Sequence, residues 1–77
     1  MPTRAVRTYQ IRLERHLGPT VAALFPEFEL RHEAGGTSVL VGAQTDQAAL
    51  HGALARVRDL GLVLCEVRAV DASEPDR

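Results

Sequence analysis

One amphipathic segment in the second half of the chain limits the folds that are open to it. Before Gly61, apolar residues recur at helical spacing and share one face of a predicted helix. These residues are Leu50, Ala53, Leu54, Val57 and Leu60. Thr45 or Asp46 is suited to cap the start of the helix, and Gly61 to the left-handed conformation that ends one. A β-rich run begins at once with Leu62, so this region predicts a strand end, a helix and a strand.

Alternation of apolar and polar residues predicts the strands, because side chains on a strand point to opposite faces in turn. The predicted strands cover residues 6–13, 27–33, 37–43 and 62–70. Gly35 and Gly36 suit the positive φ of a tight hairpin between the second and third strands. A short first helix is predicted to open at Pro19 and to stop at Pro26, with Leu17, Val21, Leu24 and Phe25 on its apolar side.

The order strand, helix, strand, strand, helix, strand predicts the fold class. Two right-handed βαβ crossovers laid into one sheet give an α+β, ferredoxin-like βαββαβ sandwich. We expect a four-stranded antiparallel sheet in the order 4-1-3-2 with both helices on one face. Residues 1–70 are expected to form this single domain, and residues 71–77 a disordered tail.

The opposite face of the sheet is predicted to be uncovered and to mix charged with apolar residues, which suits a polar dimer interface or solvent. It is expected to carry Thr8, Gln10, Arg12, Glu29, Arg31, Ser38, Leu40, Leu64, Glu66 and Arg68. Val39 and Val41 are assigned to the core side. Cys65 is also assigned there, as a small core residue and not a nucleophile.

Composition restricts the partners. Nine basic residues, all Arg, balance ten acidic ones without a clustered basic patch, and the strand aromatics Tyr9 and Phe28 are expected to face the core, so we expect no nucleic-acid partner. No apolar run approaches the roughly 18 residues of a membrane span, so no membrane partner is expected either. A single cysteine fits the reducing cytoplasm. Because so short a chain builds only a small core, we expect a homodimer or larger assembly.

Three predicted connections should meet at one end of the sheet: residues 14–18, 33–36 and 59–62. The candidate ligand-binding residues there are Glu14, His16, Gly18, Glu33 and Asp59, with His32 nearby. Histidine and carboxylate side chains can bind zinc, but no pair has the close spacing of a dedicated site, so solvated loop ends are favoured and no metal or cofactor is predicted. Pro2 could serve as the base of a small tautomerase only if it lined a pocket, and the first strand is expected to begin after it, near Val6. No catalytic residue is assigned.

The stretch from residue 37 to residue 67 reads TSVLVGAQTDQAALHGALARVRDLGLVLCEV. It resembles a group of short bacterial proteins, mainly actinobacterial, with no assigned activity. The resemblance covers most of the chain and implies the ferredoxin-like fold, but it carries over no functional residues. The chain departs from the group's pattern near the strand end, where Val41 and Ala43-Gln44 stand in place of a common Thr and Pro.

A second similarity concerns the first loop. His16-Leu17-Gly18-Pro19 is similar to the glycine-containing loop that opens a helix in small-molecule-sensing ACT domains. The similarity implies an effector site at a dimer interface near residues 14–19. We therefore expect a small homo-oligomeric binding module for a protein partner or a small effector. The alternative is a small cofactor-free enzyme with a pocket at a dimer interface.

Overall fold

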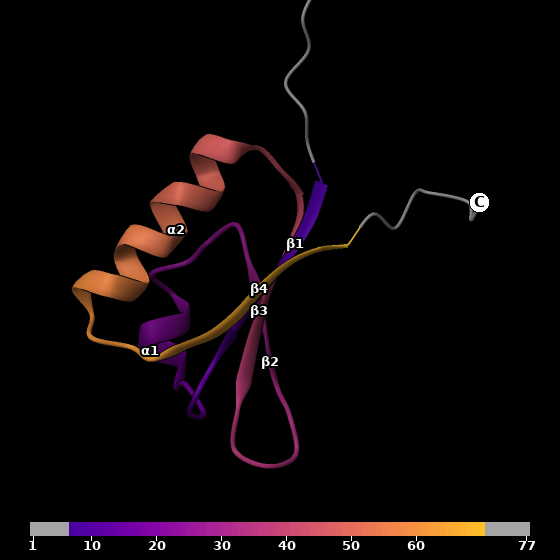
Figure 1. Cartoon of the computed structure of the whole chain (residues 1–77). Coiled ribbons are helices and arrows are strands. Elements are labelled where there is room, and N and C mark those ends of the chain that lie inside the picture. The colour runs from indigo at the N-terminus through magenta and orange to yellow at the C-terminus, as the bar shows by residue number, and fades with distance from the viewer. Residues whose placement is uncertain (1–6, 71–77) are drawn as a thin grey trace, which may run out of the picture.

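The computed structural model describes residues 7–70 and shows one sheet covered by helices. Its elements are β1 (Arg7–Leu13), α1 (Pro19–Ala22), β2 (Glu29–His32), β3 (Ser38–Thr45), α2 (Gln47–Asp59) and β4 (Leu64–Val70). All neighbouring strands are antiparallel, in the order β2-β3-β1-β4. Figure 1 shows α1 and α2 on the same side of these strands. The predicted ferredoxin-like α+β arrangement is confirmed. The predicted tail at residues 71–77 and Pro2, which was weighed as a tautomerase base, lie outside the described residues.

Helix α2 begins and ends where the sequence predicts. The Asp46 carboxylate accepts a hydrogen bond of 2.8 Å from the Ala49 N–H, which satisfies a donor that the first turn leaves without a helical partner. At the other end Gly61 has a φ of 71°. The Gly61 and Leu62 N–H groups then donate back to carbonyls of the last turns, each at 3.0 Å. These two bonds form the Schellman closure of a helix.

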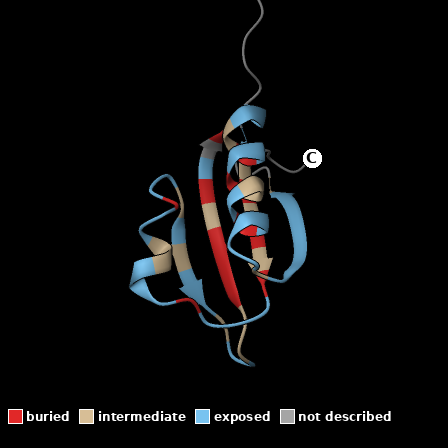
Figure 2. Ribbon diagram, turned by 90° about the vertical axis from the view of Figure 1, so that its left-hand side faces the viewer, coloured by how far each residue is buried: buried red, intermediate tan, exposed pale blue. Residues whose placement is uncertain are grey.

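Both helices cover the same face of the sheet and share one core. The buried members of this core are Tyr9, Ile11, Leu13, Leu17, Phe25, Leu40, Leu50, Ala53 and Val57. Figure 2 shows the buried positions running along the central strands and the facing side of α2. The prediction that Leu24 and Leu60 belong to the core is wrong, because each is 43% exposed. Helix α1 is also shorter than predicted: it ends at Ala22, and tighter i to i−3 bonds continue to Phe25.

The hairpin between β2 and β3 sets the register of this half of the sheet. The Glu33 N–H donates to the Thr37 carbonyl at 2.8 Å across a three-residue loop. The φ of 95° at both glycines of that loop confirms the predicted tight turn. The bond between Glu33 and Thr37 places His32 opposite Ser38 in the ladder.

This register reverses the predicted faces of β3. Directly opposed residues share a face of the sheet, and Leu40 lies opposite both Leu30 and Ile11. Leu40 and Ser38 therefore face the core, with no exposed surface, whereas Val39 and Val41 lie on the open face. The prediction was displaced by one residue, which moves every side chain of a strand to the other side.

A β-bulge changes the faces of β4. Arg12 pairs with Glu66, but the next residue, Leu13, pairs with Leu64, which leaves Cys65 as the additional residue. Leu64 therefore lies on the core side, opposite Leu13, and not on the open face as predicted. The prediction for Cys65 is also wrong, because Cys65 is exposed and is not part of the core.

Candidate functional site

The loop from β1 to α1 is held against β3 by one buried hydroxyl. Ser38 donates from Oγ to the Arg15 carbonyl at 2.7 Å and accepts a bond of 3.0 Å from the Leu17 N–H. Ser38 has no exposed surface, so both bonds are shielded from water. Sequence reasoning missed this residue because it placed Ser38 on the open face. The length of the hairpin loop was the signal that could have found it.

Two stacked histidines join the same loop to the hairpin. Nε2 of His16 lies 3.0 Å from the Glu33 carbonyl oxygen, and Nε2 of His32 lies 2.8 Å from the Leu17 carbonyl oxygen. A carbonyl can only accept, so both rings carry a proton on Nε2. The ring centroids are 4.5 Å apart and the planes differ by 10°. We call these two rings the histidine corner.

The structure brings together only part of the predicted ligand site. His16 contacts Glu33, and the Glu14 N–H donates at 3.0 Å to the carbonyl of Val63, just before β4. Gly18 begins α1 with open space beside its Cα. Asp59 pairs with its neighbour in α2 at 3.3 Å, and no described contact joins it to the other four residues. Within residues 7–70, no group of three or more histidine, cysteine or acidic side chains is placed to hold a metal ion.

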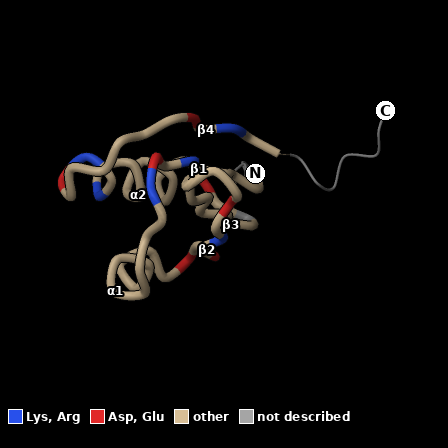
Figure 3. The backbone as a smooth tube through the Cα atoms, turned by 90° about the horizontal axis from the view of Figure 1, so that it is seen from below, with Lys and Arg blue, Asp and Glu red and all other residues tan. Residues whose placement is uncertain are grey.

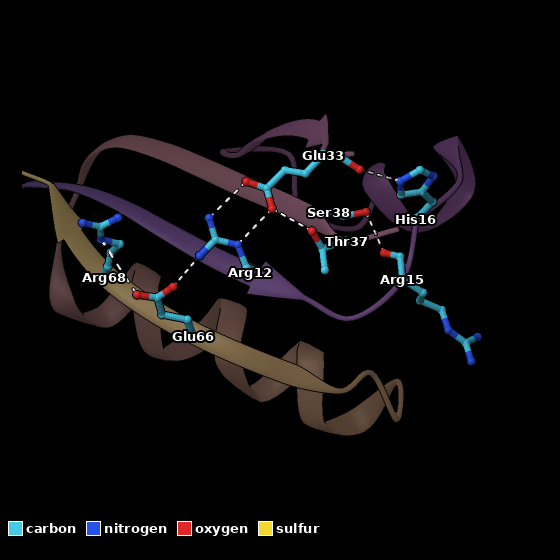
Figure 4. A network of polar contacts seen from close by, with 8 residues as sticks. All are labelled: Arg12, Arg15, His16, Glu33, Thr37, Ser38, Glu66 and Arg68. Atoms are coloured by element: carbon cyan, nitrogen blue, oxygen red, sulfur yellow. Dashed lines mark hydrogen bonds and ion pairs between the residues drawn. The ribbon is translucent and has the colours of Figure 1, made fainter. Parts of the chain in front are cut away.

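The open face of the sheet is centred on Arg12. Its Nε and Nη2 atoms bind the two carboxylate oxygens of Glu33 at 2.9 and 3.0 Å, while Nη1 binds Glu66 (Figure 4). The Thr37 hydroxyl donates to Glu33 at 2.7 Å. A guanidinium that binds both oxygens of one carboxylate fixes the relative orientation of the two side chains as well as their distance. The network therefore joins β1, the hairpin and β4 into one unit.

These contacts set the charge states of the network. The hydrogen bond from Arg12, and then that from Thr37, lower the pKa of Glu33 from 4.5 to about 2 against a smaller opposing effect of desolvation. The hydrogen bond to Glu33 correspondingly raises the pKa of Arg12. Neither side chain changes its protonation near neutral pH, so neither is suited to transfer a proton there.

Strand β4 forms an exposed edge of the sheet. Among the strands of the described region it pairs only with β1, and all of its residues except Val70 are exposed. Large aliphatic side chains on β4, on the link before it and at the end of α2 are 37–56% exposed. They are Leu60, Val63, Leu64 and Val67, and we call them the β4 edge patch. Figure 3 shows that charges of both signs lie along β4.

The fold and these surfaces define a small α+β sandwich with an uncovered, charge-paired sheet face and an aliphatic edge strand. The chain belongs to the family DUF8691, a domain of unknown function, whose model matches residues 8–68. Neither the comparison with curated proteins nor that with solved structures gave a match. Within residues 7–70 no helix has both the length and the apolar character needed to cross a membrane.

Proposed function

We propose that this chain is a small homo-oligomeric interaction module and not an enzyme. The observation that carries the proposal is the β4 edge patch. Edge strands in water are usually short, charged with lysine or interrupted by proline, because an open edge invites pairing with another chain. Strand β4 spans seven residues with the sequence LCEVRAV, contains no proline, carries its two charged residues of opposite sign on the open face, and exposes aliphatic side chains. Exposed aliphatic side chains on an edge strand are typical of an interaction surface.

The rigidity of the open face also supports an interaction module. The Arg12 network joins three parts of the sheet, so a partner would meet a surface that is already ordered. Preorganised surfaces lose less side-chain freedom on binding. The free thiol of Cys65 fits action in the cytoplasm, which we propose as the site of action.

The histidine corner is our proposed site for a small effector, by analogy with ACT-like loops. Its support is the exposed His16 beside Glu33, with open space at Gly18. A thermal-shift screen of small metabolites should find a compound that raises the melting temperature of the wild type and raises that of His16→Ala less. Failure of every compound to shift the wild type would remove this part of the proposal.

Self-association is tested by sedimentation velocity at micromolar and at hundred-micromolar concentrations. The wild type should sediment at twice the mass of one chain. Leu64→Glu should shift the equilibrium toward monomer. Leu24→Glu is the matched control, since Leu24 is equally exposed, at 43% against 45%, but lies outside the β4 edge patch. A wild type that remains monomeric at both concentrations would contradict the proposal.

A further inference from the structure

We infer that β4 pairs in antiparallel fashion with β4 of a second copy of this chain, with Val67 on the two-fold axis. The inference rests on the proposed self-association and specifies its surface and register. In this arrangement the two four-stranded sheets join edge to edge. Opposed residues share a face, so the helices of both copies lie on the same side of the joined sheet.

The free edge of β4 meets the first requirement for this pairing. In a sheet, each strand uses alternate backbone groups toward each neighbour, so a strand with one neighbour leaves a row of donors and acceptors unused on its other side. Strand β4 has β1 as its neighbour along Thr8 to Leu13. Its seven residues include no proline, so no N–H is missing from the free row.

The charges of β4 select the register. Glu66 and Arg68 flank Val67 and lie on the open face, opposite Arg12 and Gln10 of β1. With Val67 on the axis, each Glu66 lies opposite the partner's Arg68. With the axis at Glu66 or at Arg68, like charges would lie opposite each other. Opposite charges directly across a strand pair stabilise it and like charges destabilise it, so the sequence of β4 is complementary to itself in one register.

The open-face network would continue across such an interface. Glu66 binds Arg12 through Oε1, and its Oε2 lies 3.9 Å from Nε of Arg68 in the same chain. The side chains of Glu66 and Arg68 are 46% and 56% exposed, so each has room for a second partner. The partner's Arg68 would give Glu66 a further cation and connect the two Arg12 networks through the axis.

The other face of the pair would bury aliphatic surface. Val67 lies opposite Ile11 in the β1–β4 ladder, on the core side of the sheet, and is 37% exposed. Pairing on the axis places Val67 against the partner's Val67. Each copy then covers an exposed residue of the β4 edge patch in the other, which removes apolar surface from water.

Cysteine cross-linking tests the register directly. Val67→Cys in a Cys65→Ser background places two thiols across an antiparallel pair, where Cα atoms lie about 4.5–5.5 Å apart and a disulfide can form. Ala69→Cys in the same background is the matched control, because Ala69 lies on the same face of the same strand. In the proposed register its two copies are offset by four residues, about 14 Å along the strand. Mild oxidation should give covalent dimers of the first variant and not of the second.

Sedimentation of the wild type and of the reduced variants distinguishes failure of the proposed register from failure of self-association itself. A wild type that is dimeric, with cross-linking of Ala69→Cys or of neither variant, would overturn this register and leave self-association standing. A monomeric wild type would overturn both.

As a second test, Arg68→Glu and Glu66→Arg should each weaken their own dimer at least tenfold, and an equal mixture should restore it as a heterodimer. Far-ultraviolet circular dichroism verifies that each variant is folded. Failure of the mixture to associate would contradict the charge pairing.

Discussion

The guanidinium of Arg12 on β1 and the carboxylate of Glu33, directly after β2, meet through two parallel hydrogen bonds, at 2.9 and 3.0 Å, although β3 lies between β1 and β2. On β3, Val39 lies opposite Arg12 on the same face and is only 5% exposed. The charged groups of this face therefore lie beside a valine that is almost fully covered. The pair holds the tip of the hairpin in place relative to the central strand, which links local electrostatics to the overall shape of the sheet.

The stability of the folded chain should fall in acid because of Glu33. Its pKa is lowered from 4.5 to about 2 in the folded state, so unfolding takes up a proton in this range. The stabilisation is complete above about pH 5 and is lost as the pH falls from 4.5 toward 2. We expect Glu33→Gln to lower the melting temperature at pH 7, with a difference from the wild type that shrinks toward pH 2.

The matched control for this titration is Glu29→Gln. Glu29 lies on the same face, but its side chain is 65% exposed, and within residues 7–70 its one ion pair is with Arg31, at 3.3 Å. Its substitution should change the melting temperature little at any pH, because exposed ion pairs contribute little. Carbon-detected NMR of the side-chain carboxyls gives the Glu33 pKa directly. A value near 4.5 would contradict the network described above.

Ser38→Ala should destabilise the fold by about 1–3 kcal/mol, the usual cost of a buried polar group left without a partner. The substitution leaves the Leu17 N–H and the Arg15 carbonyl without their bonds to the hydroxyl. Urea denaturation measures the change in the free energy of unfolding. Thr20→Ala, at an exposed position, is the control and should change it by less than about 0.5 kcal/mol. Equal effects of the two substitutions would show that Ser38 does not hold the loop.

Gly42→Ala should destabilise the fold by about 1–3 kcal/mol through overpacking. A Cβ at Gly42 would lie 2.5 Å from the ring of Phe28 and 2.7 Å from the hydroxyl of Thr45. Phe28→Leu should recover part of the loss when combined with Gly42→Ala.

Gly52→Ala is the opposite case, since the space around this exposed glycine of α2 is open, and should stabilise the helix by about 0.5–1 kcal/mol. Thermal unfolding of Gly42→Ala, of its combination with Phe28→Leu and of Gly52→Ala checks all of these signs.

The fold could be predicted from the sequence because each element carried its own local signal. The cap at Asp46 and the stop at Gly61 bounded α2, and hairpin glycines joined two alternating stretches. The order of elements then left one topology. The faces of β3 were predicted wrongly because apolar residues occur at both alternations, in Val39, Leu40 and Val41. The hairpin decides between them: a three-residue loop pairs residue 33 with residue 37, and therefore Leu30 with Leu40.

The candidate site could be predicted only in part, for a similar reason. Topology correctly placed His16 near Glu33, because both follow strands that end at one side of the sheet. The two hydrogen bonds of Ser38 could not be predicted because they depend on which face of β3 this residue occupies. The exposure of Cys65 depends on a β-bulge. A bulge arises from packing across the sheet and has no local signature in β4. The exposure of the β4 edge patch could likewise not be predicted, because it depends on how far α2 covers each side chain.

Amide hydrogen exchange at two protein concentrations shows whether β4 becomes covered when two chains associate. The two edges of the sheet provide an internal comparison, since β2 is the other edge strand. We predict that amides of residues 66–68 exchange more slowly as the concentration rises, whereas those of β2 do not change. Exchange in β4 that is independent of concentration, or protection that appears at β2 instead, would contradict it.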